Sequence, residues 1–375
     1  MTHETALPVV RLEGTPRQQG RTHGEALRAA VAHNVELYLH RFLTDARLER
    51  AEVDRRAAAY LEVFTRESPD YRESMEGIAE ASGRTLAEIA MLNARYEILY
   101  SAYSAIGMEE AAGGCTAFAA SRAVSADGHL RIGQSWDWIP DVRGALLESA
   151  AEDLRTLAFT EAGIAGGKIG MNSAGIGLVI NGLLSHLDDW SRLGVPFHLR
   201  TARILGSRTF EEAREQATAG VHGVSANFLI ARGRGGATGG AEQIVDLETS
   251  PGGWLALDPT GGTLAHANHF LQPDRLSLWQ PLREERSSTY QRCARMEQLL
   301  ARRAESGPLS AGDLEDFLRD HEGHPDSICR HPNPHLPPEE RTETVFAVVM
   351  DLDALEMRYA GGPPCTYSFA TRTLH

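Results

Sequence analysis

The chain has 375 residues, of which 42% are hydrophobic, so it can bury a large core as one large or two coupled domains. That composition excludes a disordered adaptor. The formal net charge of -14 at pH 7 leaves no electrostatic footprint for nucleic acid or anionic lipid, and we expect neither as a partner. Because no apolar stretch approaches the roughly 20 residues of a membrane span, and the first residues lack a signal-peptide pattern, we expect a cytoplasmic location.

Helical patterns dominate the first hundred residues. After a Thr-Pro start signal, apolar residues recur at helical spacing from about Thr15 to Leu43, which predicts one long amphipathic helix. Two or three further helices are predicted next. One follows Ser68-Pro69-Asp70, and another opens at Thr85, where Glu88 completes a capping-box pattern.

Beyond Gly113 the pattern changes to short β-branched or aromatic runs separated by glycine and asparagine turns. KIGMNSAGIGLVING, Lys168 to Gly182, predicts a hairpin, and ANFLIAR with EQIVDLE predicts another pair of strands. ETVFAVVMDL and ALEMRYAGG predict a terminal hairpin. Helices are predicted to return at Pro196–Leu205 and Ser287–Arg303, so helices should enclose an antiparallel β region.

Two motifs suggest phosphate binding and a zinc-protease site, but the residues around them do not fit either. The glycine-rich run Gly233–Gly240 lacks the strand-loop-helix unit of a phosphate cradle. His321 and His324 are three residues apart, with a glycine between them, whereas a zinc-protease helix needs histidines four apart. His266 and His269 are interpreted as loop residues or supporting residues, so we expect no catalytic metal and no cofactor.

The four cysteines lie far apart in the chain, and none belongs to the close pairs of a zinc ribbon or a redox motif. We therefore expect no disulfide framework and assess each thiol alone. Cys293 lies in a helical pattern, and Cys329 lacks a preceding glycine, so both are interpreted as packing residues.

Cys115 follows the small-residue run Ala111–Gly114 and precedes an apolar strand. Because Gly114 has no side chain, a thiolate can approach its carbonyl, and an N-to-S acyl shift followed by hydrolysis would make Cys115 a new amino terminus. A free α-amino group titrates at about 7.7–8.0 and can take the proton of its own thiol. Taken alone, the segment also fits a small buried cysteine without chemistry.

Further motifs carry a family resemblance. GGCTAFAAS and DGHLRIGQSWDW, Asp127 to Trp138, resemble the autoproteolytic isopenicillin N acyltransferase family of N-terminal nucleophile hydrolases. LNARYEI, Leu92 to Ile98, is similar to the segment upstream of that family's processing site. GMNSAGIGLVING, SANFLIA, HANHF from His266 and DSICR from Asp326 follow in the family's order, and the matches cover most of the chain.

The resemblance implies a set of site residues. It makes Cys115 the nucleophile and Asp137 the carboxylate that orients the new amine and stabilises its charged form. It makes Asn268 a donor to the developing oxyanion. By analogy with the wider fold, Asn181 would be the second such donor, although asparagine before glycine is also a turn signal. Arg330 would pair with Asp137 or with the substrate.

The resemblance also implies the fold and the chain organisation. The fold would be α+β, a four-layer αββα sandwich with a helical N-terminal segment. Cleavage between Gly114 and Cys115 would leave a light chain, residues 1–114, packed against a catalytic heavy chain, residues 115–375. The two chains would remain one integrated fold and would be each other's partners.

The reaction implied by the resemblance proceeds through a thioester on Cys115. A small-molecule amide or acyl-thioester, with acyl-coenzyme A among the candidates, would donate the acyl group to an amine or to water. Trp136, Trp138 and Ile139 would line an apolar acyl pocket, or else belong to the core. A β-lactam substrate does not follow from membership alone.

Two other functions fit parts of the sequence. Cys115 with His266 or His269 would make a papain-like thiol hydrolase that does not cut itself. The chain would otherwise be an uncut, inactive relative that binds or assembles. The mass of the mature protein distinguishes the papain-like hydrolase from the family mechanism, because the first predicts one full-length chain and the second predicts two polypeptides.

Overall fold

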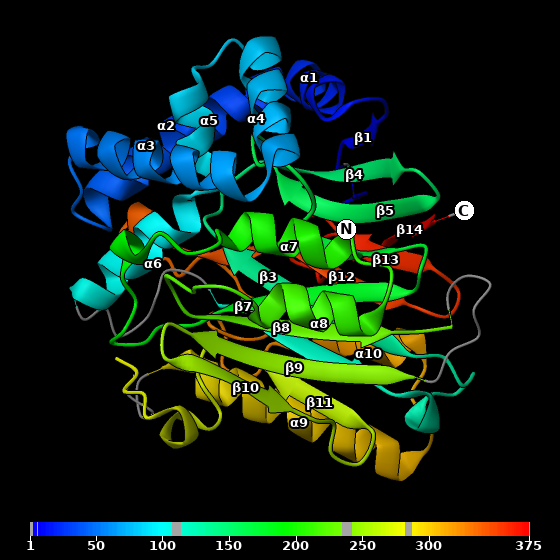
Figure 1. Ribbon diagram of the computed structural model, residues 1–375. Coiled ribbons are helices and arrows are strands. Elements are labelled where there is room, and N and C mark those ends of the chain that lie inside the picture. Colours follow the sequence, from blue (N-terminus) through cyan, green and yellow to red (C-terminus); the bar gives the residue numbers. More distant parts are fainter. Residues whose placement is uncertain (1–2, 6, 107–113, 235–241, 282–286, 375) are drawn as a thin grey trace.

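The computed structural model describes residues 3–5, 7–106, 114–234, 242–281 and 287–374. Its described part contains two β-sheets that face each other, with helices on both outer sides (Figure 1). The residues 111–113 that precede Gly114, and most of the glycine-rich run, lie outside the described residues. Among the described residues, every helix is too short or too polar to cross a lipid bilayer.

One sheet has eight strands in the order β1-β4-β5-β6-β7-β8-β9-β10. Their bounds are β1 (Val9–Leu12), β4 (Gly144–Ala151), β5 (Leu154–Glu161), β6 (Ile169–Asn172), β7 (Ile176–Gly182), β8 (Ala226–Arg232), β9 (Gln243–Ser250) and β10 (Gly253–Leu257). β1 pairs with β4 in parallel, and the other neighbours are antiparallel. The predicted β6–β7 hairpin and β8–β9 pair are confirmed.

The other sheet has six strands in the order β11-β2-β3-β12-β13-β14, all antiparallel. Their bounds are β2 (Thr116–Ala120), β3 (Arg131–Trp138), β11 (Thr263–His266), β12 (Glu343–Asp351), β13 (Glu356–Ala360) and β14 (Ala370–Thr373). The predicted terminal hairpin is confirmed as β12–β13.

The predicted helical N-terminal segment is confirmed. It contains α1 (Pro16–Ala26), α2 (Arg28–Thr44), α3 (Arg50–Glu67), α4 (Pro69–Ser82), α5 (Leu86–Asn93) and α6 (Arg95–Ala105). Ser68 caps α4 by accepting the N–H of Tyr71, and Thr85 with Glu88 forms the predicted capping box of α5. The later helices are α7 (Phe197–Leu205), α8 (Phe210–Thr218), α9 (Ser288–Ser306) and α10 (Ala311–Leu318).

The single long helix predicted from Thr15 is wrong, because the chain bends at Leu27 (φ -113°, ψ 19°) and forms α1 and α2. Helical hydrogen bonding continues across the bend, since the N–H of Leu27 donates to His23 O at 3.0 Å. The bend accompanies a close approach of α1 to α4. A Cβ at Gly20 would lie 2.0 Å from the carbonyl oxygen of Ser74, so only glycine fits there.

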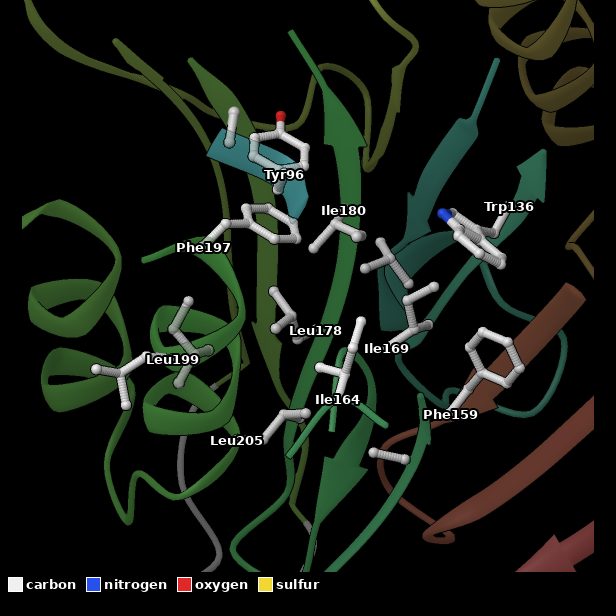
Figure 2. Close-up of a cluster of buried hydrophobic side chains, with 14 of the residues drawn as sticks. Tyr96, Trp136, Phe159, Ile164, Ile169, Leu178, Ile180, Phe197, Leu199 and Leu205 are labelled. Atoms are coloured by element: carbon white, nitrogen blue, oxygen red, sulfur yellow. The ribbon is translucent and has the colours of Figure 1, made fainter. Parts of the chain in front are cut away.

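Packing on both faces of each sheet produces four layers. Leu178 and Ile180 of β7 belong to one buried cluster with Phe197 of α7, as Figure 2 shows, so α7 covers the outer face of the eight-stranded sheet. Phe118 of β2 packs with Met296 of α9 in a second cluster, so α9 and α10 cover the six-stranded sheet. The α+β, four-layer αββα prediction is therefore confirmed.

Candidate active site

Cys115 directly precedes β2, and its side chain is buried. Side chains alternate along a strand. Ala117 belongs to the core between the sheets, whereas Phe118 packs against α9, so the alternation places Cys115 toward the space between the sheets and Thr116 toward α9. The thiol and the backbone of Cys115 therefore meet different surroundings.

The backbone of Cys115 is held by Asn268 and Arg292. The N–H of Cys115 donates to Asn268 Oδ1 at 2.6 Å, and Arg292 Nη1 donates to the carbonyl oxygen of Cys115 at 2.6 Å. The same guanidinium donates to Thr116 Oγ1 at 2.9 Å and to Asn268 Oδ1 at 3.0 Å. The buried guanidinium of Arg292 thus holds the Cys115 carbonyl directly and the Cys115 N–H through Asn268.

Arg292 was missed in the sequence, where it lies inside the predicted helix Ser287–Arg303. It is buried in α9 on the same stripe as Cys293, Met296 and Leu300. A charged residue at helical spacing with apolar core positions is the signal that could have found it, because a buried arginine needs polar partners.

Gly114 lies against two guanidinium groups. A Cβ at this position would be 2.7 Å from Arg292 Nη2 and 3.2 Å from Arg330 Cζ. The first distance is too short for any real Cβ contact, so a larger residue would displace Arg292 from Cys115. Glycine at position 114 therefore lets both guanidinium groups lie against the backbone.

Asp137 and Arg330 lie on the α9 side of the six-stranded sheet. Asp137 Oδ1 accepts the hydroxyl of Thr344 at 2.7 Å, and Asp137 Oδ2 is 4.0 Å from Arg330 Nε. Arg330 also donates to Ser288 Oγ at 2.7 Å and to Thr342 Oγ1 at 2.9 Å. Among the described residues, Asp137 Oδ2 has no hydrogen-bond partner, so a buried acceptor is left for a further donor.

Burial governs the ionisation of both reactive groups. It raises the pKa of the Cys115 thiol to about 11, the charge of Asp137 adds to this, and the Asp137 N–H, Arg292 and Lys168 oppose it. Burial also raises the pKa of Asp137 to about 7, against the charges of Arg330 and Arg292. The thiol of the unbroken chain is therefore mainly protonated at neutral pH and needs a base.

A narrow cavity adjoins Cys115 on the inner side of the sheet. Its lining includes five aromatic and three charged side chains and joins the first hundred residues to the two sheets: Arg95, Tyr96, Tyr100, Cys115, Trp136, Asp137, Trp138, Lys168, Ile180, Gly182, Phe197 and Asn268. Ile139 is buried in the main core and is not among these residues. Tyr96 stacks on Phe197 with ring centroids 4.1 Å apart, as Figure 2 shows.

Lys168 is a buried cation in this cavity that the sequence interpretation did not single out. Its Nζ lies 3.3 Å from the ring centroid of Trp136 and donates to Glu161 Oε1 at 2.5 Å. Burial lowers the pKa of Lys168 to about 7, although the charge of Glu161 opposes that shift. Arg95 of α6 pairs with the same carboxylate.

The two asparagines proposed as oxyanion donors lie in different positions. Asn268 directs its carbonyl to Cys115 and its amide nitrogen to Gly182 O, at 3.0 Å. Asn181 accepts the amide of Asn227 at 3.1 Å, is buried, and is not among the lining residues of the cavity. The structure thus brings together four of the five predicted catalytic residues: Cys115, Asp137, Asn268 and Arg330. Asn181 directly precedes Gly182 in β7, but its side chain does not line the cavity.

His266 and His269 make contacts that differ from those of a papain-like base. His266 Nε2 lies 3.0 Å from Glu248 Oε1. Burial opposes its charged form, but Asp246 and Glu248 raise the pKa of His266 to about 9, so the ring holds its proton at neutral pH. His269 Nδ1 lies 3.0 Å from Thr289 Oγ1.

Residues 124–364 match the sequence model of a family described as acyl-coenzyme A:6-aminopenicillanic acid acyl-transferase. The 40 kDa form of acyl-coenzyme A:6-aminopenicillanic-acid-acyltransferase from Emericella nidulans is 30% identical over 351 residues, which cover 91% of this chain and 89% of that protein. The chain belongs to this acyltransferase family. The family resemblance predicted from the motifs is therefore confirmed. The prediction that the chain belongs to a family of enzymes is confirmed with it.

Solved structures similar to this family member include two hydrolases. A mutant of conjugated bile acid hydrolase from Clostridium perfringens has a TM-score of 0.48 at 12% identity, covering 69% of this chain and 92% of that one. The Caenorhabditis elegans ortholog of N-acylethanolamine-hydrolyzing acid amidase has a TM-score of 0.45 at 13% identity. The match covers 70% of this chain and 100% of that one.

Proposed function

We propose that the chain cuts itself between Gly114 and Cys115 and then uses Cys115 as an amino-terminal nucleophile in acyl transfer. The observation that carries this proposal is the hydrogen bond from the Cys115 N–H to Asn268 Oδ1, at 2.6 Å, beside a buried thiol. The acceptor that holds this peptide nitrogen suits an amine at the same position after cleavage.

The cutting step is an N-to-S acyl shift. Cys115 Sγ attacks the carbonyl carbon of Gly114, the thiol proton passes to the Cys115 nitrogen, and the peptide C–N bond breaks. The resulting thioester is hydrolysed by water, which leaves the Gly114 carboxylate and restores the thiol. The products are residues 1–114 and residues 115–375.

The freed amine then serves as the base in each catalytic cycle. It accepts the thiol proton while Cys115 Sγ attacks the carbonyl carbon of an amide or acyl-thioester, and it returns a proton to the leaving group. Asp137 orients the amine through its unpartnered Oδ2, and Arg330 balances the charge of that carboxylate. An amine or water then takes the acyl group from the thioester.

The developing oxyanion needs donors in a site without bulk water. An amide nitrogen carries two hydrogens, and Gly182 takes one from Asn268, so we assign the other to the oxyanion. The unpartnered Asn181 Nδ2 is proposed as the second donor, which requires a side-chain movement into the cavity. Arg292 is a positioning residue in this scheme, because it acts through Asn268 and the Cys115 carbonyl.

The cavity favours an apolar or aromatic acyl group, since Trp136, Trp138 and Phe197 are among its lining residues. Acyl-coenzyme A is a donor to test first, because the relative from Emericella nidulans is named for it. A papain-like mechanism is disfavoured by the charged, Glu248-bound ring of His266.

Intact mass under denaturing conditions tests the cutting step. The natural chain is expected to give two polypeptides, 1–114 and 115–375, and Cys115→Ala a single chain. Cys293→Ala is the matched control, since this buried thiol of α9 lies outside the cavity and alanine suits a helix.

Turnover of the purified protein tests the rest. Acyl amides and acyl-coenzyme A thioesters are offered with and without added amines, and the acylated product or free acid is measured. A full-length single chain that turns substrate over would overturn self-cleavage, and an active Cys115→Ala protein would overturn the nucleophile. A single inactive chain would support the uncut binding relative.

A further inference from the structure

Two cysteines and two histidines converge at a place outside the described cavity. Cys329, His331, Cys365 and His321 each offer one ligand atom, and these atoms all lie within 4.8 Å of one another. His331 Nε2 lies 3.1 Å from His321 Nε2, 3.3 Å from Cys365 Sγ and 3.7 Å from Cys329 Sγ. Assessing each thiol alone therefore missed that Cys329 and Cys365 lie in one cluster.

Hydrogen bonding alone does not account for this cluster. A neutral imidazole nitrogen either donates one proton or accepts one, yet His331 Nε2 faces three partners. Two of those partners are thiols, which are weak donors and weak acceptors. A single cation at the centre would satisfy all four atoms together.

The distances fit a small tetrahedral ion. Zinc bonds of about 2.3 Å to sulfur and about 2.0–2.1 Å to nitrogen separate neighbouring tetrahedral ligand atoms by about 3.3–3.8 Å. The three measured separations, 3.1, 3.3 and 3.7 Å, lie at or near that range. Two thiolates with two imidazoles form a donor set that zinc prefers and magnesium or calcium does not.

We propose that Cys329, Cys365, His321 and His331 bind one zinc ion. Four protein ligands leave no open position, so the site is structural rather than catalytic. This site differs from the zinc-protease motif that the sequence analysis rejected. His324 is not one of its ligands, and two thiols and His331 complete the set with His321. His321 to His324 also form turns rather than a helix.

The proposed ion would join two segments that are distant in sequence. His321 follows α10, Cys329 and His331 precede β12, and Cys365 follows β13. The segments already touch, since Arg319 Nε donates to Pro364 O at 3.2 Å. A zinc ion would cross-link this contact and stabilise the folded state, because the four ligands do not meet in the unfolded chain.

The ion would also fix the backbone on both sides of Arg330. Two proposed ligands, Cys329 and His331, are its neighbours in the chain. The Arg330 N–H donates to Thr344 Oγ1 at 3.0 Å, and that hydroxyl donates to Asp137. Zinc thus acts as a positioning element for the charged side of the candidate active site, without contact to a substrate.

Metal analysis of the tag-free, full-length protein tests the proposal. About one zinc per chain is expected in the natural protein and in Cys115→Ala, so the result does not depend on self-cleavage. The double variant Cys329→Ser, Cys365→Ser is expected to lose the ion. His335→Gln is the control, since His335 is an exposed histidine of the same region outside the cluster.

A second measurement uses the natural sequence and does not rely on the variant folding. Removal of the metal with a chelator should lower Tm, and added zinc should restore it, because an ion that binds the native state stabilises it. Cobalt in place of zinc should give a thiolate charge-transfer band. The proposal would be overturned if the purified protein held no zinc and its Tm did not change on addition of zinc. A disulfide between Cys329 and Cys365, seen as a protein mass lower by two hydrogens, would also overturn it.

Discussion

The two faces of the six-stranded sheet beside Cys115 differ in chemistry. On the face toward α9, Thr116 and Asp137 meet the guanidinium groups of Arg292 and Arg330. On the face toward the other sheet, Cys115 meets the cavity that Trp136, Trp138 and Phe197 help to line. Alternation along β2 and β3 separates these surroundings by a single residue, because neighbouring side chains point to opposite faces.

This difference assigns separate tasks to the two faces. Under the proposed function, the α9 face would control the cut, because Arg292 holds the carbonyl of Cys115. Under the same proposal, the inner face would control the choice of substrate, because it holds the thiol and the adjoining cavity. Changes on the α9 face should alter self-cleavage most, and changes on the inner face should alter specificity with cleavage retained.

The largest expected effect is that of Arg292→Met. Loss of the guanidinium leaves the Cys115 carbonyl and Asn268 Oδ1 without a charged donor in a buried site, and self-cleavage should slow by about 10²–10³-fold. The rate is followed by mass after synthesis or refolding. Arg303→Met is the control, since this arginine of α9 pairs with Asp313 near the surface. Equal rates for both variants would contradict the division of tasks.

The next effect concerns the pH dependence of stability, measured in Cys115→Ala so that the chain stays whole. The pKa of Asp137 is raised to about 7, so between about pH 4 and pH 7 the native state holds a proton that the unfolded state has released. The free energy of unfolding should therefore fall as pH rises through this window. Added Asp137→Asn should remove on the order of 2 kcal/mol of that fall.

Urea unfolding at pH 5 and pH 8 measures this contribution. The comparison is between Cys115→Ala and the double variant, and the decisive quantity is the difference between the two pH values in each protein. If both proteins lose equal stability between the two pH values, Asp137 is already ionised at pH 5. Arg330 would then dominate over burial.

The smallest effect is expected on the inner face. Trp136→Leu opens space beside Cys115, and each additional buried methylene of a donor should gain about 0.8 kcal/mol, or about fourfold in kcat/KM. Cleavage should continue. The control is Trp254→Leu, because Trp254 of β10 is 42% exposed. A chain-length profile identical to that of the natural protein would remove Trp136 from the acyl pocket.

Local features of the fold could be predicted from the sequence. The capping box at Thr85 and the Ser68 cap lie within four residues of the helix starts they fix. Hairpins with short turns, such as β6–β7, are local in the same sense. The bend at Leu27 was not predicted, and it accompanies the close approach of α1 to α4, which is a contact between distant segments.

The candidate site divides in a similar way. Cys115 and Asp137 stand in motifs with recognisable neighbours, so family resemblance could propose them. Arg292 has no motif and Lys168 only opens a hairpin pattern, and their importance depends on burial next to Cys115 and Trp136, which tertiary packing alone creates. Cys329 and Cys365 meet only because α10, β12 and β13 bring their segments together.

The placement of β1 limits what the proposed self-cleavage could separate. This strand belongs to the first 114 residues, yet it pairs in parallel with β4 from Val9 to Leu12. Tyr96 and Tyr100 of the same piece form part of the cavity wall. A fragment beginning at Cys115 and made by itself would expose the edge of β4 to aggregation and lack part of the cavity wall, so the two products of the proposed cleavage should fold and remain together.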